Sequence, residues 1–128
     1  MLKEVIKKRI RSFRYAFQGI FFLFRTELNA KIHLAAALLA VLMGVFFHIT
    51  PEEWCLIVLC IFSTFSAEAF NTAIEALVDL VSPENHPLAG RAKDLAAGAV
   101  LLTAIGAAVI GGVIFLPKIL DLLFSYWQ

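Results

Sequence analysis

The stretch LAAGAVLLTAIGAAVIGGVIFL, from Leu95 to Leu116, contains no charged residue and is rich in alanine and glycine. At a rise of about 1.5 Å per residue, a helix of this length crosses the roughly 30 Å hydrocarbon core of a bilayer. Small residues along such a helix allow neighbouring helices to approach closely. The stretch therefore predicts a transmembrane helix, which we expect at about residues 92–117.

Two more segments toward the N-terminus are long and apolar enough to cross a membrane. One covers about residues 30–49 and ends before Pro51. The other covers about residues 53–81 and is uncharged from Trp54 until Glu68. Each meets the requirement of about 20 mostly apolar residues for a membrane-spanning helix. Three spans joined by short connections predict an all-α membrane protein.

The composition supports this fold class. The chain of 128 residues is 61% hydrophobic and 16% charged. Soluble domains are roughly 45–50% apolar and about 25% charged. A single soluble core of this size has no room for the excess, whereas a helical bundle that faces lipid does. We expect one domain, residues 1–128.

The N-terminal stretch, about residues 2–25, has a different pattern. Its apolar residues recur with the period of a helix, and basic residues lie between them. The apolar positions are Leu2, Val5, Ile6, Ile10, Phe13, Phe17, Ile20, Phe21 and Phe24. This pattern predicts an amphipathic helix that lies on the membrane surface. A nucleic-acid-binding tail is the weaker alternative, because nothing would then cover the apolar face.

Charge asymmetry predicts the orientation. Residues 1–31 hold eight Lys and Arg and the rest of the chain three, which makes the total of 11. The turn at residues 50–53 carries only acidic charge, whereas the segment 82–94, expected to be a loop, carries Arg91 and Lys93. Because cytoplasmic segments carry an excess of Lys and Arg, we expect the N-terminus and residues 82–94 in the cytoplasm.

The second span carries polar residues on its cytoplasmic half. Glu68, Asn71, Glu75 and Asp79 fall within an arc of about 80° on a helix. An ionisable group at membrane depth costs about 2.5–3.5 kcal/mol, so such a stripe needs partners or cations. Asp79, at the end of the stripe, could equally be an ordinary solvated residue. The depth of Glu68 and Asn71 together points to function.

The stripe and its flanks favour a site for phosphate and a divalent cation. Mg²⁺ binds one or two carboxylates together with substrate phosphates. Glu27 lies at the entry to the first span, at the same depth as Glu75, so the two could meet across helices as metal ligands. Taken alone, Glu27 is more often a solvated residue at the start of a helix. Arg91 and Lys93 offer positive charge for phosphate oxygens. A transporter or channel subunit is the competing class, and it would require polar residues through the full depth of the membrane. The half of the second span between Trp54 and Phe62 has none.

Two stretches make the chain resemble the prokaryotic diacylglycerol kinase family, which consists of small integral-membrane lipid kinases and includes the undecaprenol kinases. They are EAFNTAIEALVD, residues 68–79, and HPLAGRAKDLAAGAV, residues 86–100. The resemblance covers nearly the whole chain. It implies a homotrimer with active sites shared between subunits, in the bacterial inner membrane. It also implies ATP as co-substrate, Mg²⁺ as cofactor and a lipid alcohol as acceptor, with no nucleic-acid partner.

The resemblance also implies roles for individual residues. Glu68 matches the catalytic base, and Glu27 and Glu75 match the ligands of the metal ions that accompany ATP. The positions that match residues around the nucleotide and the catalytic centre are Tyr15, Asn71, Glu84, Asn85, His86, Lys93 and Asp94. Lys8 and Arg9 both match a basic residue of the N-terminal helix, and Asp79 continues the stripe as a supporting residue.

Two stretches point to one branch of the family. ELNAKIH, residues 27–33, and IFLPK, residues 114–118, are more similar to the undecaprenol kinases than to the enterobacterial diacylglycerol kinases. Undecaprenol is therefore the favoured acceptor, and diacylglycerol is the alternative.

Overall fold

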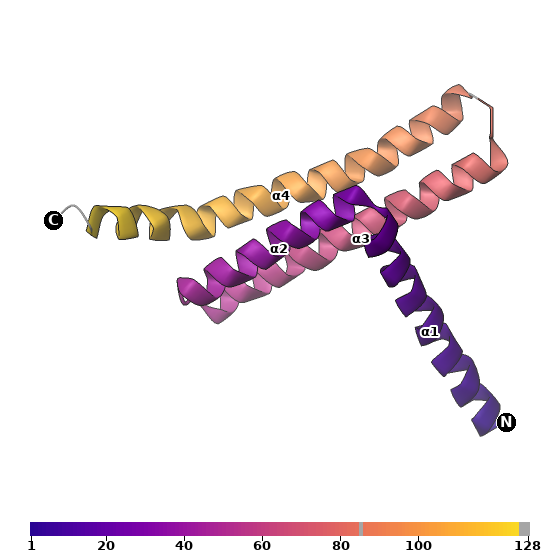
Figure 1. Ribbon diagram of the computed structural model, residues 1–128, viewed down its shortest axis with the longest axis horizontal. Coiled ribbons are helices and arrows are strands. Elements are labelled where there is room, and N and C mark those ends of the chain that lie inside the picture. Colours follow the sequence, from indigo (N-terminus) through magenta and orange to yellow (C-terminus); the bar gives the residue numbers. More distant parts are fainter. Residues whose placement is uncertain (85, 126–128) are drawn as a thin grey trace.

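The computed structural model describes residues 1–84 and 86–125, and these residues form four helices (Figure 1). The helices are α1 (Leu2–Thr26), α2 (Leu28–Phe46), α3 (Pro51–Val81) and α4 (Pro87–Ser125). The predicted all-α architecture is confirmed. The most extensive packing is between α3 and α4, and α2 packs on α3.

Three of the helices, α2, α3 and α4, are long and apolar enough to cross a membrane. They contain 19, 31 and 39 residues, or about 28, 46 and 58 Å of helix. At most 22% of the apolar window of any of them is buried within the chain. Most of their apolar surface therefore needs a cover from outside the chain, which lipid or further subunits supply.

The helix α2 ends at Phe46, earlier than the predicted limit near residue 49. His48 adopts the left-handed conformation with φ of 50°, and the N–H of Ile49 donates to the carbonyl of Gly44 at 3.1 Å. This pairing across six residues is the Schellman ending of a helix. Ile49 then turns inward and is buried.

The helix α3 begins with a complete capping box. The Thr50 hydroxyl accepts from the N–H of Glu53 at 3.3 Å, and the Glu53 carboxylate accepts from the N–H of Thr50 at 2.8 Å. Pro51 follows at the first helical position, where its missing N–H costs nothing. The other oxygen of Glu53 accepts from Lys118 on α4 at 2.7 Å, so one side chain both caps α3 and links it to α4.

The apolar core lies at this same end of the bundle. Four buried residues form it, and they are Ile49, Ile57, Ile114 and Phe115. Next to it, the ring of Trp54 lies so close to Gly44 that a Cβ atom at residue 44 would be 2.8 Å from the ring. The absence of a side chain at Gly44 lets α2 and the start of α3 pack closely.

The connection between α3 and α4 is shorter than expected. We expected a loop over residues 82–94, but α4 already begins at Pro87, so this prediction is wrong. Proline is favoured at the first position of a helix. The preceding His86 accepts from the N–H of Leu88 through its Nδ1 atom at 3.2 Å, and this bond caps the helix. Arg91, Lys93 and Asp94 therefore lie on the first turns of α4. At its other end, α4 continues through Pro117, past the predicted limit of the span.

The helix α1 leaves the bundle at a corner formed by Glu27. Glu27 has an extended backbone (φ −87°, ψ 122°) and lies between the end of α1 and the start of α2. Near this corner, the rings of Phe24 and Phe65 pack edge to face with centroids 5.0 Å apart. Beyond it, α1 projects away from the other helices (Figure 1).

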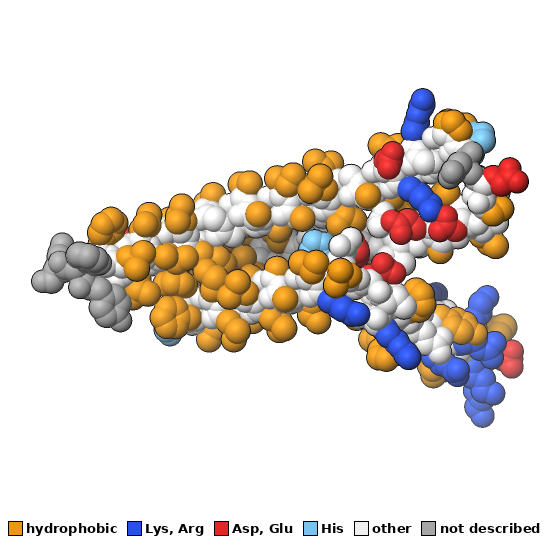
Figure 2. Space-filling view, turned by 45° about the horizontal axis from the view of Figure 1, so that its top comes forward, with side chains coloured by type: hydrophobic (Ala, Val, Ile, Leu, Met, Phe, Trp, Pro, Cys, Tyr) orange, Lys and Arg blue, Asp and Glu red, His pale blue; other side chains and the backbone are white. Residues whose placement is uncertain are grey.

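Charge is concentrated at one end of the molecule. In Figure 2, hydrophobic side chains cover most of the length, while Lys, Arg, Asp and Glu gather where α1, the end of α3 and the start of α4 lie. The stripe on α3 ends in this charged region, so the candidate site lies at the border between apolar and charged surface.

Candidate active site

Glu68 is the most deeply buried large side chain, with 1% of its surface exposed. Its Oε2 atom has no hydrogen-bond partner among the described residues. A buried polar atom without a partner is costly, and such groups mark strained or functional sites. Glu68 is therefore enclosed by the chain itself and not exposed on the surface of α3.

Asn71, one turn farther along α3, is also buried and faces Glu75. Its amide group donates to the Glu75 carboxylate at 2.9 Å, a spacing of one helical turn. Its Oδ1 atom has no partner in the described part of the chain. An oriented amide with a free carbonyl oxygen is available to a ligand or a solvent molecule that enters between Glu68 and Glu75.

The second wall of the site comes from the corner between α1 and α2. His33, Glu27 and Glu75 lie near the carboxyl group of Glu68, and the Asn29 side chain lies close to the same group. The predicted proximity of Glu27 to the stripe is thus present in the structure. Thr26 donates to the Glu27 carboxylate at 3.1 Å and helps to fix it.

Sequence reasoning missed the positions of Asn29 and His33. The signal was available, because both residues fall in the stretch ELNAKIH at 27–33 and lie four residues apart on one face of α2. The residue pattern alone assigned no role to His33, and the structure places it near Glu68.

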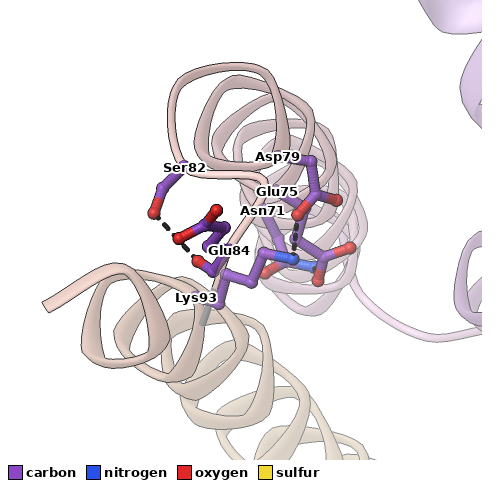
Figure 3. A network of polar contacts seen from close by, with 6 residues as sticks. All are labelled: Asn71, Glu75, Asp79, Ser82, Glu84 and Lys93. Carbon is purple, nitrogen blue, oxygen red and sulfur yellow. Dashed lines mark hydrogen bonds and ion pairs between the residues drawn. The ribbon is translucent and has the colours of Figure 1, made fainter. Parts of the chain in front are cut away.

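Beyond the stripe, the end of α3 and the start of α4 enclose a cleft of about 420 Å³. Asp79 lines one wall and forms an ion pair with Lys93 on the other wall (Figure 3). The connection contributes Glu84 and His86, and the Ser82 hydroxyl donates to the carbonyl of Glu84 at 3.2 Å. Of the predicted nucleotide contacts, Glu84, His86 and Lys93 line this cleft, while Asn85 lies outside the described residues.

Other predicted residues lie elsewhere within the single chain. Tyr15 is exposed on α1, as are Lys8 and Arg9. Because α1 projects away from the bundle, the fold brings none of the three to Glu68 of the same chain (Figure 1). Asp94 is exposed on the first turns of α4, next to Lys93.

A second hollow, of about 310 Å³, lies deeper between α2, α3 and α4. Alanine side chains and His33 line it, together with Thr64, whose hydroxyl is buried without a partner in the described residues. Thr64 lies one turn before Glu68 on the same face of α3, so the polar stripe extends farther into the apolar region than we predicted.

The donor set at the site fits a hard cation that is shared with a ligand. The described residues contain no group of three or more His, Cys, Asp or Glu that could hold a metal alone. Mg²⁺ needs only one or two carboxylates when phosphate oxygens supply further ligands. Glu27 and Glu75 are half-buried carboxylates on opposite walls, and Asn71, whose Oδ1 atom has no partner in the described residues, lies on α3 one turn before Glu75. The residues present therefore fit Mg²⁺ in the presence of a phosphate ligand.

The helices and the site define a class of protein: a small helical membrane protein with a buried carboxylate next to a polar cleft. Comparison with known proteins identifies the family. A family model described as prokaryotic diacylglycerol kinase matches residues 14–115. The chain therefore belongs to the prokaryotic diacylglycerol kinase family.

Individual relatives agree with this assignment. The chain is 44% identical to an undecaprenol kinase of Bacillus subtilis over 91% of this chain and 95% of the relative. It is 37% identical to a diacylglycerol kinase of Synechocystis over 94% of this chain and 69% of the relative. It is also 31% identical to the diacylglycerol kinase of Escherichia coli K12 over 78% and 82% of the two chains. These comparisons confirm the prediction of a lipid kinase.

Proposed function

We propose that the protein transfers the γ-phosphate of ATP to the hydroxyl group of undecaprenol at the cytoplasmic surface of the bacterial inner membrane. The observation that carries this proposal is the buried Glu68 carboxylate with its unpartnered Oε2 atom. A carboxylate at this depth, next to a polar cleft, suits a reaction between a hydroxyl group in lipid and a nucleotide in water.

In this proposal Glu68 is the general base. The unpartnered oxygen of Glu68 accepts the proton of the lipid hydroxyl. At the same time the hydroxyl oxygen of the lipid attacks the γ-phosphorus, and ADP leaves. General bases of this kind contribute about 10²–10⁴-fold to a rate. Phosphoryl transfer otherwise depends on positioning and on neutralising charge, so the remaining residues bind and orient.

The carboxylates of Glu27 and Glu75 would hold Mg²⁺, which neutralises charge on the phosphates when it is bound. Asn71 holds Glu75 through its amide at 2.9 Å and keeps its own carbonyl oxygen free. Lys93 would contact the phosphates, and Asp94 would lie next to it at the edge of the same site. Glu84, Asn85 and His86 would contact the rest of the nucleotide.

The choice of undecaprenol rests on two supports. The relative that is 44% identical over nearly its whole length is an undecaprenol kinase. The stretches at residues 27–33 and 114–118 also resemble that branch. Diacylglycerol is the second candidate, because relatives that are 37% and 31% identical are diacylglycerol kinases.

We also propose that α1 lies on the membrane surface and that the active protein is a homotrimer. Basic and apolar residues alternate along α1 with a helical period, which suits an interfacial helix. Much of the apolar surface of α2, α3 and α4 is exposed in the single chain. Tyr15 with Lys8 or Arg9 would then complete the nucleotide site of a neighbouring subunit.

The test is phosphate transfer from labelled ATP with Mg²⁺ by purified protein in detergent micelles. Undecaprenol and diacylglycerol are offered separately, at equal mole fractions. The expected result is labelled undecaprenyl phosphate, formed faster than phosphatidic acid. A faster reaction with diacylglycerol would overturn the choice of acceptor. No product from either lipid, with a folded oligomer verified, would overturn the proposed function.

A further inference from the structure

An ion pair crosses the cleft that we assign to the nucleotide, between α3 and α4. The ammonium group of Lys93 on α4 contacts the Oδ1 atom of Asp79 on α3, and Figure 3 shows the lysine side chain reaching across to α3. The side chain of Lys93 is 37% exposed and that of Asp79 is 67% exposed. Exposed pairs of this kind contribute little to folding stability. We therefore expect the Lys93–Asp79 contact to affect the cleft more than it affects folding.

The charges that line the cleft give it such a role. Among the described lining residues, Lys93 is the only Lys or Arg, while Asp79 and Glu84 are both acidic. A free Asp79 carboxylate would repel a triphosphate that enters the cleft. Paired with Lys93, it no longer adds net negative charge at this wall.

The position of the pair along α3 is equally specific. Asp79 follows Glu75 by four residues and Glu68 by eleven, on the same face of the helix. The pair therefore lies one turn beyond Glu75, which Asn71 orients from the other side. The ammonium group of Lys93 is thus held where the phosphates of a bound nucleotide would extend from the cleft toward Glu68.

We propose that Asp79 is a positioning residue for phosphoryl transfer: its carboxylate holds the Lys93 ammonium against α3, at the end of the polar stripe, where that charge meets the nucleotide phosphates. Lysine has a flexible four-carbon chain and acts as a point charge, so it depends on a second group for its position. Without Asp79, the ammonium group spends most of its time in solvent. This inference rests on the proposed function, because it takes ATP as the ligand of the cleft.

The test is a double-mutant cycle on the full-length protein in detergent micelles. Asp79→Asn is expected to raise the KM for ATP about tenfold, the effect of about 1.4 kcal/mol, with the KM for undecaprenol unchanged. Asp79→Glu should restore part of the affinity. In a Lys93→Met background, Asp79→Asn should no longer raise the KM, because Asp79 acts through Lys93; removal of the now unpaired carboxylate should leave the KM equal or lower. If Lys93→Met is inactive, the dissociation constant of a fluorescent ATP analogue, measured for the wild type, both single variants and the double variant, replaces the KM in the cycle.

A second ion pair between the same two helices supplies the matched control. Glu53 and Lys118 link α3 and α4 at the opposite end, about 39 Å along α3 from Asp79. Glu53→Gln also removes a contact between the helices, and it should leave the KM for ATP unchanged. The inference is wrong if Asp79→Asn keeps the wild-type KM for ATP. It is also wrong if Asp79→Asn still raises the KM in the Lys93→Met background, or if Glu53→Gln raises the KM equally. A wild-type protein that transfers no phosphate from ATP would instead overturn the proposed function, and this inference with it.

Discussion

At the scale of single residues, Glu68 combines deep burial with an unsatisfied oxygen. Burial of a carboxyl group opposes stability, and the fold supplies no hydrogen-bond partner for Oε2 among the described residues. Replacement by an isosteric neutral amide removes the ability to take up a proton and keeps the volume. Substitution of Glu68 should therefore lower the activity without lowering the stability of the protein.

We predict that Glu68→Gln lowers kcat by about 10²–10⁴-fold, the usual contribution of a general base. The thermal midpoint should stay equal or rise, because a neutral amide costs less to bury than a carboxylate. Initial rates with undecaprenol and thermal unfolding followed by circular dichroism measure both quantities. Thr64→Val changes another buried polar residue, one turn away, and serves as the control. A Glu68→Gln protein with wild-type turnover would remove Glu68 from the role of base.

A second residue-scale prediction concerns packing at Gly44. A Cβ atom there would lie 2.8 Å from the Trp54 ring and 3.0 Å from Ile49. We predict that Gly44→Ala destabilises the protein by about 1–3 kcal/mol, as overpacked cores do. Gly19→Ala is the matched control, since apart from its chain neighbours and the nearby backbone of α1 no atom lies within 4 Å of its Cβ position. Equal thermal midpoints for the two variants would show that the contact between α2 and α3 relaxes at no cost.

Residue-level features were predictable mainly where they follow a single helix, and the approach of Glu27 to the stripe, expected from their equal depth, is the exception. The period of α3 was sufficient to predict that Glu68 and Asn71 are buried together. Contacts between helices carry no such period, so the approach of Asn29 and His33 to Glu68 and the pairing of Glu53 with Lys118 went unpredicted. The alternative of a simply solvated Asp79 was correct in its exposure but missed its ion pair with Lys93.

At the scale of elements, α3 depends on its N-terminal cap. We predict that Thr50→Ala destabilises the protein by about 1 kcal/mol through loss of the side-chain acceptor for the N–H of Glu53. Thr50→Ser keeps the hydroxyl and should retain most of the stability. Chemical unfolding in mixed micelles measures the difference. If alanine and serine behave alike at this position, the hydroxyl contributes nothing to the start of α3.

The proposed surface position of α1 is also testable at this scale. We predict that a spin label at Phe17→Cys is accessible to oxygen in lipid, whereas a label at Gln18→Cys is accessible to a water-soluble nickel complex. The two positions lie about 100° apart on the helix, and only the first belongs to the apolar set. Both labels are placed in a background with Cys55→Ala and Cys60→Ala, reconstituted in vesicles. Equal accessibility of both labels to the nickel complex would mean that α1 is not in the interface.

The elements themselves were largely predictable, because long apolar runs allow few structures other than membrane helices. Their ends were less so. Local caps decide where a helix stops or starts, and two histidines supply them here: His48 ends α2 in a left-handed conformation, and His86 caps α4. The hydropathy of the sequence does not show where such caps form. The loop expected at residues 82–94 was therefore too long.

At the scale of the whole molecule, the single chain leaves the proposed site divided. The carboxylates and the cleft lie in the bundle, while Tyr15, Lys8 and Arg9 lie on α1, which projects away from it (Figure 1). Sequence patterns predict helices and stripes, but they do not say which chain completes a site. A homotrimer in which α1 reaches a neighbour would unite the two halves.

This arrangement predicts complementation between two defective variants. Tyr15→Ala should weaken the nucleotide contact and Glu68→Gln should remove the base, so each homotrimer has low activity. In trimers formed from an equal mixture, a site is intact when the subunit that supplies Glu68 has a neighbour that supplies Tyr15. Random assembly gives this in about a quarter of the sites. We therefore expect about a quarter of wild-type activity after the two variants are unfolded, mixed and refolded together, and none of this gain when they are refolded apart and then mixed. If co-refolding yields only the mean of the two variants, Tyr15 and Glu68 do not act at a shared site.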